Sequence, residues 1–249
     1  MKDKMQYVEN PKTKGSGIIT CIPQKGICPN RCPDCFFQSG RSYLEPLIEN
    51  LPNMPDPFYC YNGFCNRVVR VNDGNDSNVQ RERVKDMTMV YPMRFYNTAI
   101  PKDLEYFEMP VVLTVNPGEM TDNDFYNYKL SHIPKNLMFV RFRTNTWNLN
   151  LCDRAVDYYT KEEIPVVLTF MAYHNKKDIK EIEDYQYRKR TLNSYWAITN
   201  SAWLYTMDRY LGNKYVYSCG REGIASQCKF CGNCLREYFA TMEILHNET

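Results

Sequence analysis

Short apolar runs alternate along the chain with longer polar stretches. Six of the runs are rich in β-branched and aromatic residues and bounded by polar or turn-forming residues, the pattern of β-strands. Most, such as Val-Val-Leu-Thr-Val at 111–115, are nearly continuous in apolar character, as expected when both faces of a strand are covered. The predicted strands are 17–23, 67–72, 93–98, 111–116, 137–145 and 166–173.

The polar stretches between these runs carry helix signals. Helices are predicted at 77–90, 121–130, 151–163 and 194–211, the second opening on a Thr-x-x-Asp cap. Alternating strands and helices indicate a parallel sheet. The predicted fold is therefore α/β, a partial (β/α)6 TIM-like barrel at 1–212, followed after Gly212 by a small cysteine-rich metal-binding extension at 213–249.

Composition narrows the class of protein. The chain of 249 residues has a net charge of +2, which gives no clear nucleic-acid signal, and the mixed charges of 176–190 suggest a solvated helix face. It has neither a signal-peptide pattern at its start nor a run of eighteen apolar residues, so a cytoplasmic protein without a membrane partner is expected.

Eleven cysteines in a reducing compartment favour metal ligation over disulfides. Seven of them fall in two tight groups, and Cys21, Cys60, Cys65 and Cys152 are scattered. The first group has C-x3-C-x2-C spacing at Cys28, Cys32 and Cys35, in a proline-rich loop after the first predicted strand. Three thiolates can hold three corners of an iron–sulfur cubane and leave the fourth iron open.

This loop resembles that of the radical S-adenosylmethionine (SAM) superfamily in both spacing and position. The resemblance implies a [4Fe–4S] cluster on Cys28, Cys32 and Cys35, whose open iron binds the amino and carboxylate groups of SAM. It implies an enzyme that reductively cleaves SAM to a 5′-deoxyadenosyl radical, which acts on a substrate that the sequence does not identify. It also implies an electron donor such as flavodoxin or ferredoxin.

The resemblance assigns further residues to the SAM pocket. The family usually has an aromatic residue before the third cysteine, but Asp34 stands there in this chain. Phe36 or Phe37 is therefore the candidate for the adenine contact, with ordinary core packing as the alternative. The turn after the second strand resembles the family's Gly-Gly-Glu element. By this resemblance the Asp73 carboxylate and the backbone groups of Asn72 and Gly74 would receive the ammonium of SAM. A plain Asn-Asp-Gly turn is the alternative. Polar residues at later strand ends add Asn116 and Arg143.

The second group comprises Cys219, Cys228, Cys231 and Cys234, at C-x8-C-x2-C-x2-C spacing with interspersed glycines. Four thiols at this spacing predict a metal site, and their number suits a fully ligated Fe–S cluster or a structural Zn²⁺. A fully ligated auxiliary cluster would relay electrons rather than bind substrate. Layouts of this kind are similar to those of short phage-type radical SAM-like proteins.

Two functions from different classes follow. The first is the radical SAM enzyme. The second is a non-catalytic protein in which two structural zinc sites, the first completed by Cys21, hold a surface for protein or nucleic-acid interaction. Methylation, cyclisation, dehydrogenation and carbon–sulfur bond formation all stay open for the enzyme.

Overall fold

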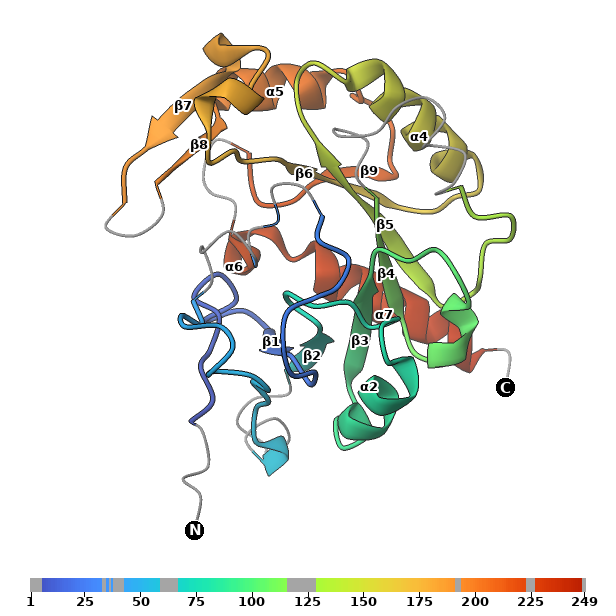
Figure 1. Cartoon of the computed structure of the whole chain (residues 1–249). Coiled ribbons are helices and arrows are strands. Elements are labelled where there is room, and N and C mark those ends of the chain that lie inside the picture. The colour runs from blue at the N-terminus through green and yellow to red at the C-terminus, as the bar shows by residue number, and fades with distance from the viewer. Residues whose placement is uncertain are drawn as a thin grey trace.

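A computed structural model describes residues 6–32, 35, 37, 43–58, 67–115, 129–190, 194–222 and 227–247. Its main feature is one curled sheet of seven strands that forms a half-barrel (Figure 1). The spatial order is β1-β2-β3-β4-β5-β6-β9, and every neighbouring pair is parallel. The strands are β1 (Ile18–Cys21), β2 (Val68–Val71), β3 (Arg94–Thr98), β4 (Val111–Val115), β5 (Leu137–Thr144), β6 (Val166–Phe170) and β9 (Val216–Ser218).

All six predicted strands are present within their expected ranges. The seventh strand, β9, was not predicted because it is only three residues long and carries a single aliphatic residue, Val216. It pairs with β6, with Val216 opposite Val166. The sheet is therefore one strand wider than a (β/α)6 arrangement.

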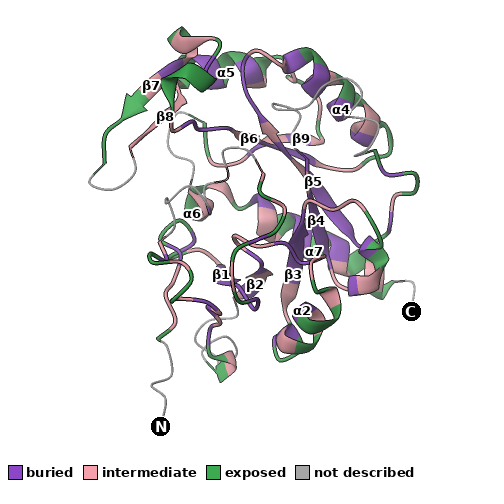
Figure 2. Ribbon diagram, viewed as in Figure 1, coloured by how far each residue is buried: buried purple, intermediate pink, exposed green. Residues whose placement is uncertain are grey.

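Helices cover the convex face of the sheet. They are α2 (Arg81–Thr88), α4 (Leu149–Lys161) and α5 (Asn200–Asp208). The short 3-10 helix η1 (Leu104–Phe107) also lies on this face. Val84 of α2, Tyr159 of α4 and Phe107 of η1 are fully buried in one apolar cluster with the outward-facing residues of β1 to β6. Figure 2 shows the result, with buried residues in the sheet and exposed ones on the outer sides of these helices.

The concave face is covered by a helix from the other end of the chain. Helix α7 (Asn233–His246) packs Tyr238 and Leu235 against the inward-facing apolar residues Ile18 and Val112. Leu235 lies so close to Gly17 that a Cβ on this glycine would be 2.6 Å from Leu235 Cδ1. Helix α6 (Cys228–Cys231) directly precedes α7.

Three expectations need correction. The predicted helix 194–211 is a short strand, β8 (Tyr195–Ile198), followed by α5, because Thr199 caps the helix by accepting a bond from the Ala202 amide. The charged stretch 176–190 is not a helix; it contains η3 (Lys176–Asp178), η4 (Ile182–Asp184) and β7 (Tyr185–Arg188), which pairs antiparallel with β8.

The third correction concerns the segment 213–249. Because β9 belongs to the main sheet and α7 packs on its concave face, the boundary expected near Gly212 does not coincide with an edge of the sheet. Most of the helix predicted at 121–130 lies outside the described residues. None of the described helices is both long and apolar enough to cross a membrane.

The packing of α7 can be tested with two neighbouring aromatic residues. Tyr238 is 2% exposed, whereas Phe239 is 54% exposed. Tyr238→Ala should lower the free energy of unfolding by about 3–5 kcal/mol, as for other buried aromatic truncations, and Phe239→Ala by less than about 1 kcal/mol. Urea unfolding of both variants measures the difference, and equal losses would contradict the burial of α7 against the sheet.

Candidate metal centres on the concave face

The concave face becomes polar toward the carboxyl ends of the strands. The first inward-facing side chain of a strand is typically apolar, as at Ile18, Val112 and Val167, and packs near α7. Two residues further on, the inward position is polar on every strand: Thr20, Arg70, Asn97, Thr114, Arg141, Thr169 and, just after β9, Cys219. Parallel strands present their carboxyl ends at a single edge, where β/α proteins build their sites.

The loop that follows β1 carries the first cysteine group and is tied to the loop after β2. The Gln24 side-chain amide donates to the backbone carbonyl of Asp76 over 2.7 Å. Between Cys28 and Cys32, the Asn30 side-chain amide donates to the Asp76 carboxylate, also over 2.7 Å. These contacts hold residues 24–32 of the loop, which form neither helix nor strand.

The Asp76 carboxylate is a buried junction for three segments. Besides Asn30, it accepts hydrogen bonds from the backbone amides of Asn78 and Ala99 and from the Thr98 hydroxyl. A buried carboxylate needs such donors, because burial without them would be costly. The cysteine loop is thereby held at the carboxyl ends of β2 and β3.

The three thiols of the first group lie near enough to influence one another. Burial raises the pKa of Cys28 to about 11, with further contributions from Asp76 and from the thiols of Cys32 and Cys35. Burial also raises the pKa of Cys32, against which the positive charge of Arg143 acts. A metal centre would therefore have to deprotonate the Cys28 and Cys32 thiols on binding.

The turn that was expected to bind SAM packs directly on this loop. A Cβ on Gly74 would lie 2.0 Å from Cδ2 of Phe37, two residues after Cys35, so the turn can approach the ring only with glycine there. Asn72 is buried with a φ of 61°, and its amide donates to the Cys21 carbonyl over 2.7 Å. The turn and the cysteine loop therefore pack against each other at this edge of the sheet.

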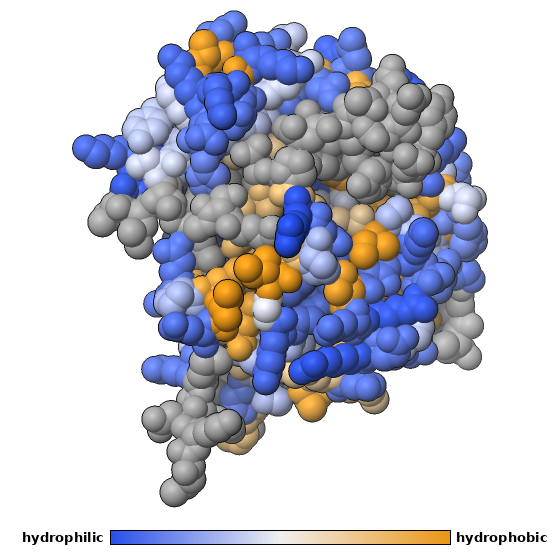
Figure 3. All heavy atoms as spheres, in the orientation of Figure 1, coloured by the Kyte–Doolittle hydropathy of each residue, from blue (hydrophilic) through white to orange (hydrophobic). Residues whose placement is uncertain are grey.

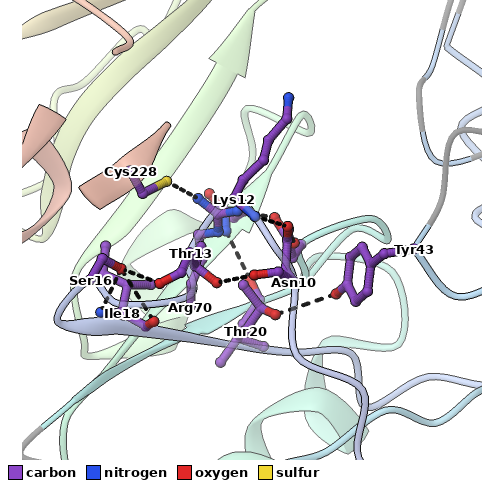
Figure 4. Close-up of polar contacts among 12 residues, drawn as sticks. Asn10, Lys12, Thr13, Ser16, Ile18, Thr20, Tyr43, Arg70 and Cys228 are labelled. Carbon is purple, nitrogen blue, oxygen red and sulfur yellow. Dashed lines mark hydrogen bonds and ion pairs between the residues drawn. The ribbon is translucent and has the colours of Figure 1, made fainter. Parts of the chain in front are cut away.

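Asp73, which was expected to receive the ammonium of SAM, is engaged elsewhere. Its carboxylate forms an ion pair with Arg70 and accepts a hydrogen bond from the Asn10 side-chain amide. The Arg70 and Asp73 side chains are each 11% exposed. Arg70 Nη1 also lies 3.9 Å from Cys228 Sγ (Figure 4), so Asp73 orients a buried cation toward the second cysteine group.

The second group is assembled by the end of the sheet and two helices. The Cys219 amide donates to the Leu168 carbonyl over 2.7 Å, which continues the pairing of β9 with β6. Cys228 and Cys231 bound α6, and Cys234 lies in the first turn of α7. Gly232, with a φ of 73°, makes the left-handed turn between the helices.

The thiols of this group differ in their affinity for protons. A hydrogen bond from Cys219 lowers the pKa of Cys231 to about 6, and the backbone amides of Gly220 and Asn233 contribute to this shift. The same hydrogen bond, together with burial, raises the pKa of Cys219 well above its usual value. Burial raises the pKa of Cys234 to about 11, against the opposing positive charges of Arg141 and Arg70. Two guanidinium groups therefore face a set of four thiols.

The N-terminal segment passes beside the second group. The Lys12 carbonyl accepts a hydrogen bond of 3.1 Å from the Cys228 amide, and Asn10 begins a turn closed by Thr13. In Figure 4, Asn10, Lys12 and Thr13 lie close to Arg70, and Tyr43 lies beyond Asn10 and Thr20. Residues remote in sequence thus converge on Arg70.

Neither thiol group, as the structure describes it, is already arranged around a metal position. Within the described part of the chain, no three or more His, Cys, Asp or Glu side chains form a group that could hold a single metal ion. Four thiolates around one Zn²⁺ must approach to Zn–S distances of about 2.3 Å, whereas a cubane places each thiolate on a different iron and spreads the ligands further apart. Zinc and an iron–sulfur cluster thus require different spacings of the same thiols.

The remaining candidates have definite places. Cys21 faces the outer apolar cluster, away from the inward side chains of β1, and so does not join the first group. Cys152 is buried in α4. Arg141 donates to the Asn97 side-chain carbonyl over 3.2 Å. Phe36, Asn116, Asp34, Cys60 and Cys65 lie outside the described residues.

Sequence reasoning missed Arg70, Asp76 and Asn30. A signal for Arg70 was present, since it is the one charged residue in Val-Val-Arg-Val and therefore faces inward opposite two outward valines. Asp76 and Asn30 had no such signal, because their partners are 22 to 46 residues away along the chain.

Comparisons with protein-family models, with curated proteins and with solved structures found no match in any of the three.

The lowered pKa of Cys231 leads to a test on the reduced, metal-free protein. Because the thiolate is the nucleophile, alkylation of Cys231 by iodoacetamide should rise through about pH 6 and be nearly maximal by pH 7, while buried Cys234 should stay unlabelled there. Mass spectrometry of peptides quenched at pH 5, 6, 7 and 8 measures both. Equal labelling of the two thiols at pH 7 would contradict the Cys219–Cys231 hydrogen bond.

Proposed function

We propose that this chain is a radical SAM enzyme with a [4Fe–4S] cluster on Cys28, Cys32 and Cys35. The observation that carries the proposal is the position of the three thiols. They lie on the loop after β1, at the carboxyl edge of a curled parallel half-barrel, against the turn at Asn72–Gly74. A structural zinc site does not require this combination of cysteine spacing, position at the carboxyl edge of the sheet and contact with the neighbouring turn.

When bound, the reduced cluster supplies the electron that cleaves SAM to methionine and a 5′-deoxyadenosyl radical. The chain's own residues would bind SAM and orient it. Arg143, which faces Cys32, places a positive charge where the carboxylate of SAM would be received. The close contact of Gly74 with Phe37 keeps the backbone of the turn beside the loop. The Asp73 carboxylate serves Arg70 in this proposal, not the ammonium.

We further propose a second Fe–S cluster on Cys219, Cys228, Cys231 and Cys234, with a role in electron relay. Four thiolates leave no vacant iron for substrate. Arg70 and Arg141 offset part of the negative charge of such a centre, which burial in the concave face would otherwise make costly. We propose that a small electron-transfer protein, such as flavodoxin or ferredoxin, is the external electron donor.

Anaerobic reconstitution tests the first site. The wild-type chain should bind about eight irons and, with dithionite, convert SAM to 5′-deoxyadenosine; replacing Cys28, Cys32 and Cys35 together by Ala should leave about four irons and abolish the product. Iron and sulfide assays and chromatography of the nucleoside measure the two results.

Cys152→Ala is the matched control, because this cysteine is buried in α4 and belongs to neither group. It should retain iron and SAM cleavage. A colourless wild-type protein with stoichiometric zinc in both sites would overturn the enzyme and favour the structural zinc protein.

Arg141 and Arg143, two residues apart on β5, should affect different centres. Arg141→Gln removes a cation beside Cys219 and Cys234, so the reduced form of the second cluster loses stabilisation and its potential should fall on the order of 50–100 mV. Arg143→Gln should instead weaken SAM binding roughly tenfold. Redox titration followed by electron paramagnetic resonance and equilibrium SAM binding measure these effects, and the reverse pattern would refute the assignment.

A further inference from the structure

Strands β7 and β8 form a two-stranded arm that projects from the half-barrel (Figure 1). The arm is inserted between β6 and α5, so it leaves the sheet at the same carboxyl edge as the Cys28 loop. Tyr173 and Trp196 attach it through reciprocal backbone hydrogen bonds of 3.0 and 2.8 Å.

The base of the arm is a small apolar cluster of its own. Tyr185, Tyr173 and Ile179 are buried there, and Trp147 packs on Tyr173 and Tyr185 with ring centroids 5.3 and 5.7 Å apart. This packing holds the start of β7 and the end of β8 in place. The outer half of the ribbon is not needed for the core.

That outer half is basic. Arg188, Lys189 and Arg190 are consecutive and exposed, and Tyr187 is 54% exposed. None of the three cations forms an ion pair with any described residue, and no acidic residue occurs at 185–190 or 194–198. The near-neutral chain thus concentrates positive charge on one projecting ribbon. Figure 3 shows the surface there as mainly hydrophilic.

Aromatic rings are interleaved with these cations. The Arg190 guanidinium lies 4.9 Å from the ring centroid of Tyr195 and donates a hydrogen bond of 3.0 Å to its hydroxyl. Tyr187 pairs with Trp196 across the strands, with ring centroids 5.4 Å apart. Arg188 is directly opposite Tyr195. The ribbon therefore offers flat π surfaces and cations in a fixed order.

We propose that this arm binds single-stranded nucleic acid. Cations that track phosphates, combined with aromatic rings on which bases stack, are the two elements by which proteins hold single strands. An acidic polypeptide would use the cations but would have little use for exposed Tyr187. The proposal does not rest on the metal centres, and it replaces the expectation that 176–190 is only a solvated helix face.

Fluorescence anisotropy with labelled oligonucleotides of about 20 residues tests the arm, using RNA and DNA of the same sequence. Arg188→Gln, Lys189→Gln and Arg190→Gln combined should raise Kd at least roughly tenfold near 0.1 M salt. They should also flatten the slope of log Kd against log salt by about 2, for three lost phosphate contacts. Arg83→Gln, Lys102→Gln and Lys161→Gln combined make the same change in charge at exposed positions off the arm and should leave Kd within about twofold.

Tyr187→Leu separates stacking from charge, because the side chain is exposed and its loss should not unfold the protein. It should raise Kd at least roughly fivefold for both RNA and DNA. No binding by the wild type, or equal losses in the arm and control triple variants, would overturn the proposal. An unchanged Kd for Tyr187→Leu together with equal competition by poly-glutamate would also overturn it, in favour of an acidic protein partner.

Discussion

The parallel alignment of seven strands is the constraint on which the other features depend. Since all carboxyl ends emerge at one edge, and inward positions recur every second residue, the polar side chains of different strands meet at one level of the concave face. Arg141 reaches Asn97 across β4 for this reason. A single antiparallel strand would have sent one of these groups to the opposite end.

Two features hold the thiol groups at that edge. The buried Asp76 carboxylate holds Asn30 of the cysteine loop and the ends of β2 and β3 together at one point. Helix α7 fills the apolar depth of the half-barrel and, in its first turn, presents Cys234 beside the inward-facing arginines. The same helix therefore completes a core and a thiol group.

Charge divides the concave face between the two groups. Arg143 acts on Cys32, whereas Arg141 acts on Cys219 and Cys234, although the two arginines are only two residues apart. Arg70, held by Asp73 and Asn10, adds a second cation on the side of Cys228. A cation near each thiol group would stabilise a negatively charged metal centre there. The projecting basic arm lies on the same edge of the sheet.

The sequence by itself determined six strands, their parallel arrangement and the two cysteine groups. Local apolar runs, the alternation of strands with helices and short cysteine spacings are sufficient to recognise these features. Only the tertiary structure decided that β9 joins the sheet, that Asp73 pairs with Arg70, and that 185–188 pairs with 195–198. Each of these depends on partners brought together by folding. A three-residue strand, a satisfied carboxylate and a helix-compatible charged run carry too little local signal to be recognised without them.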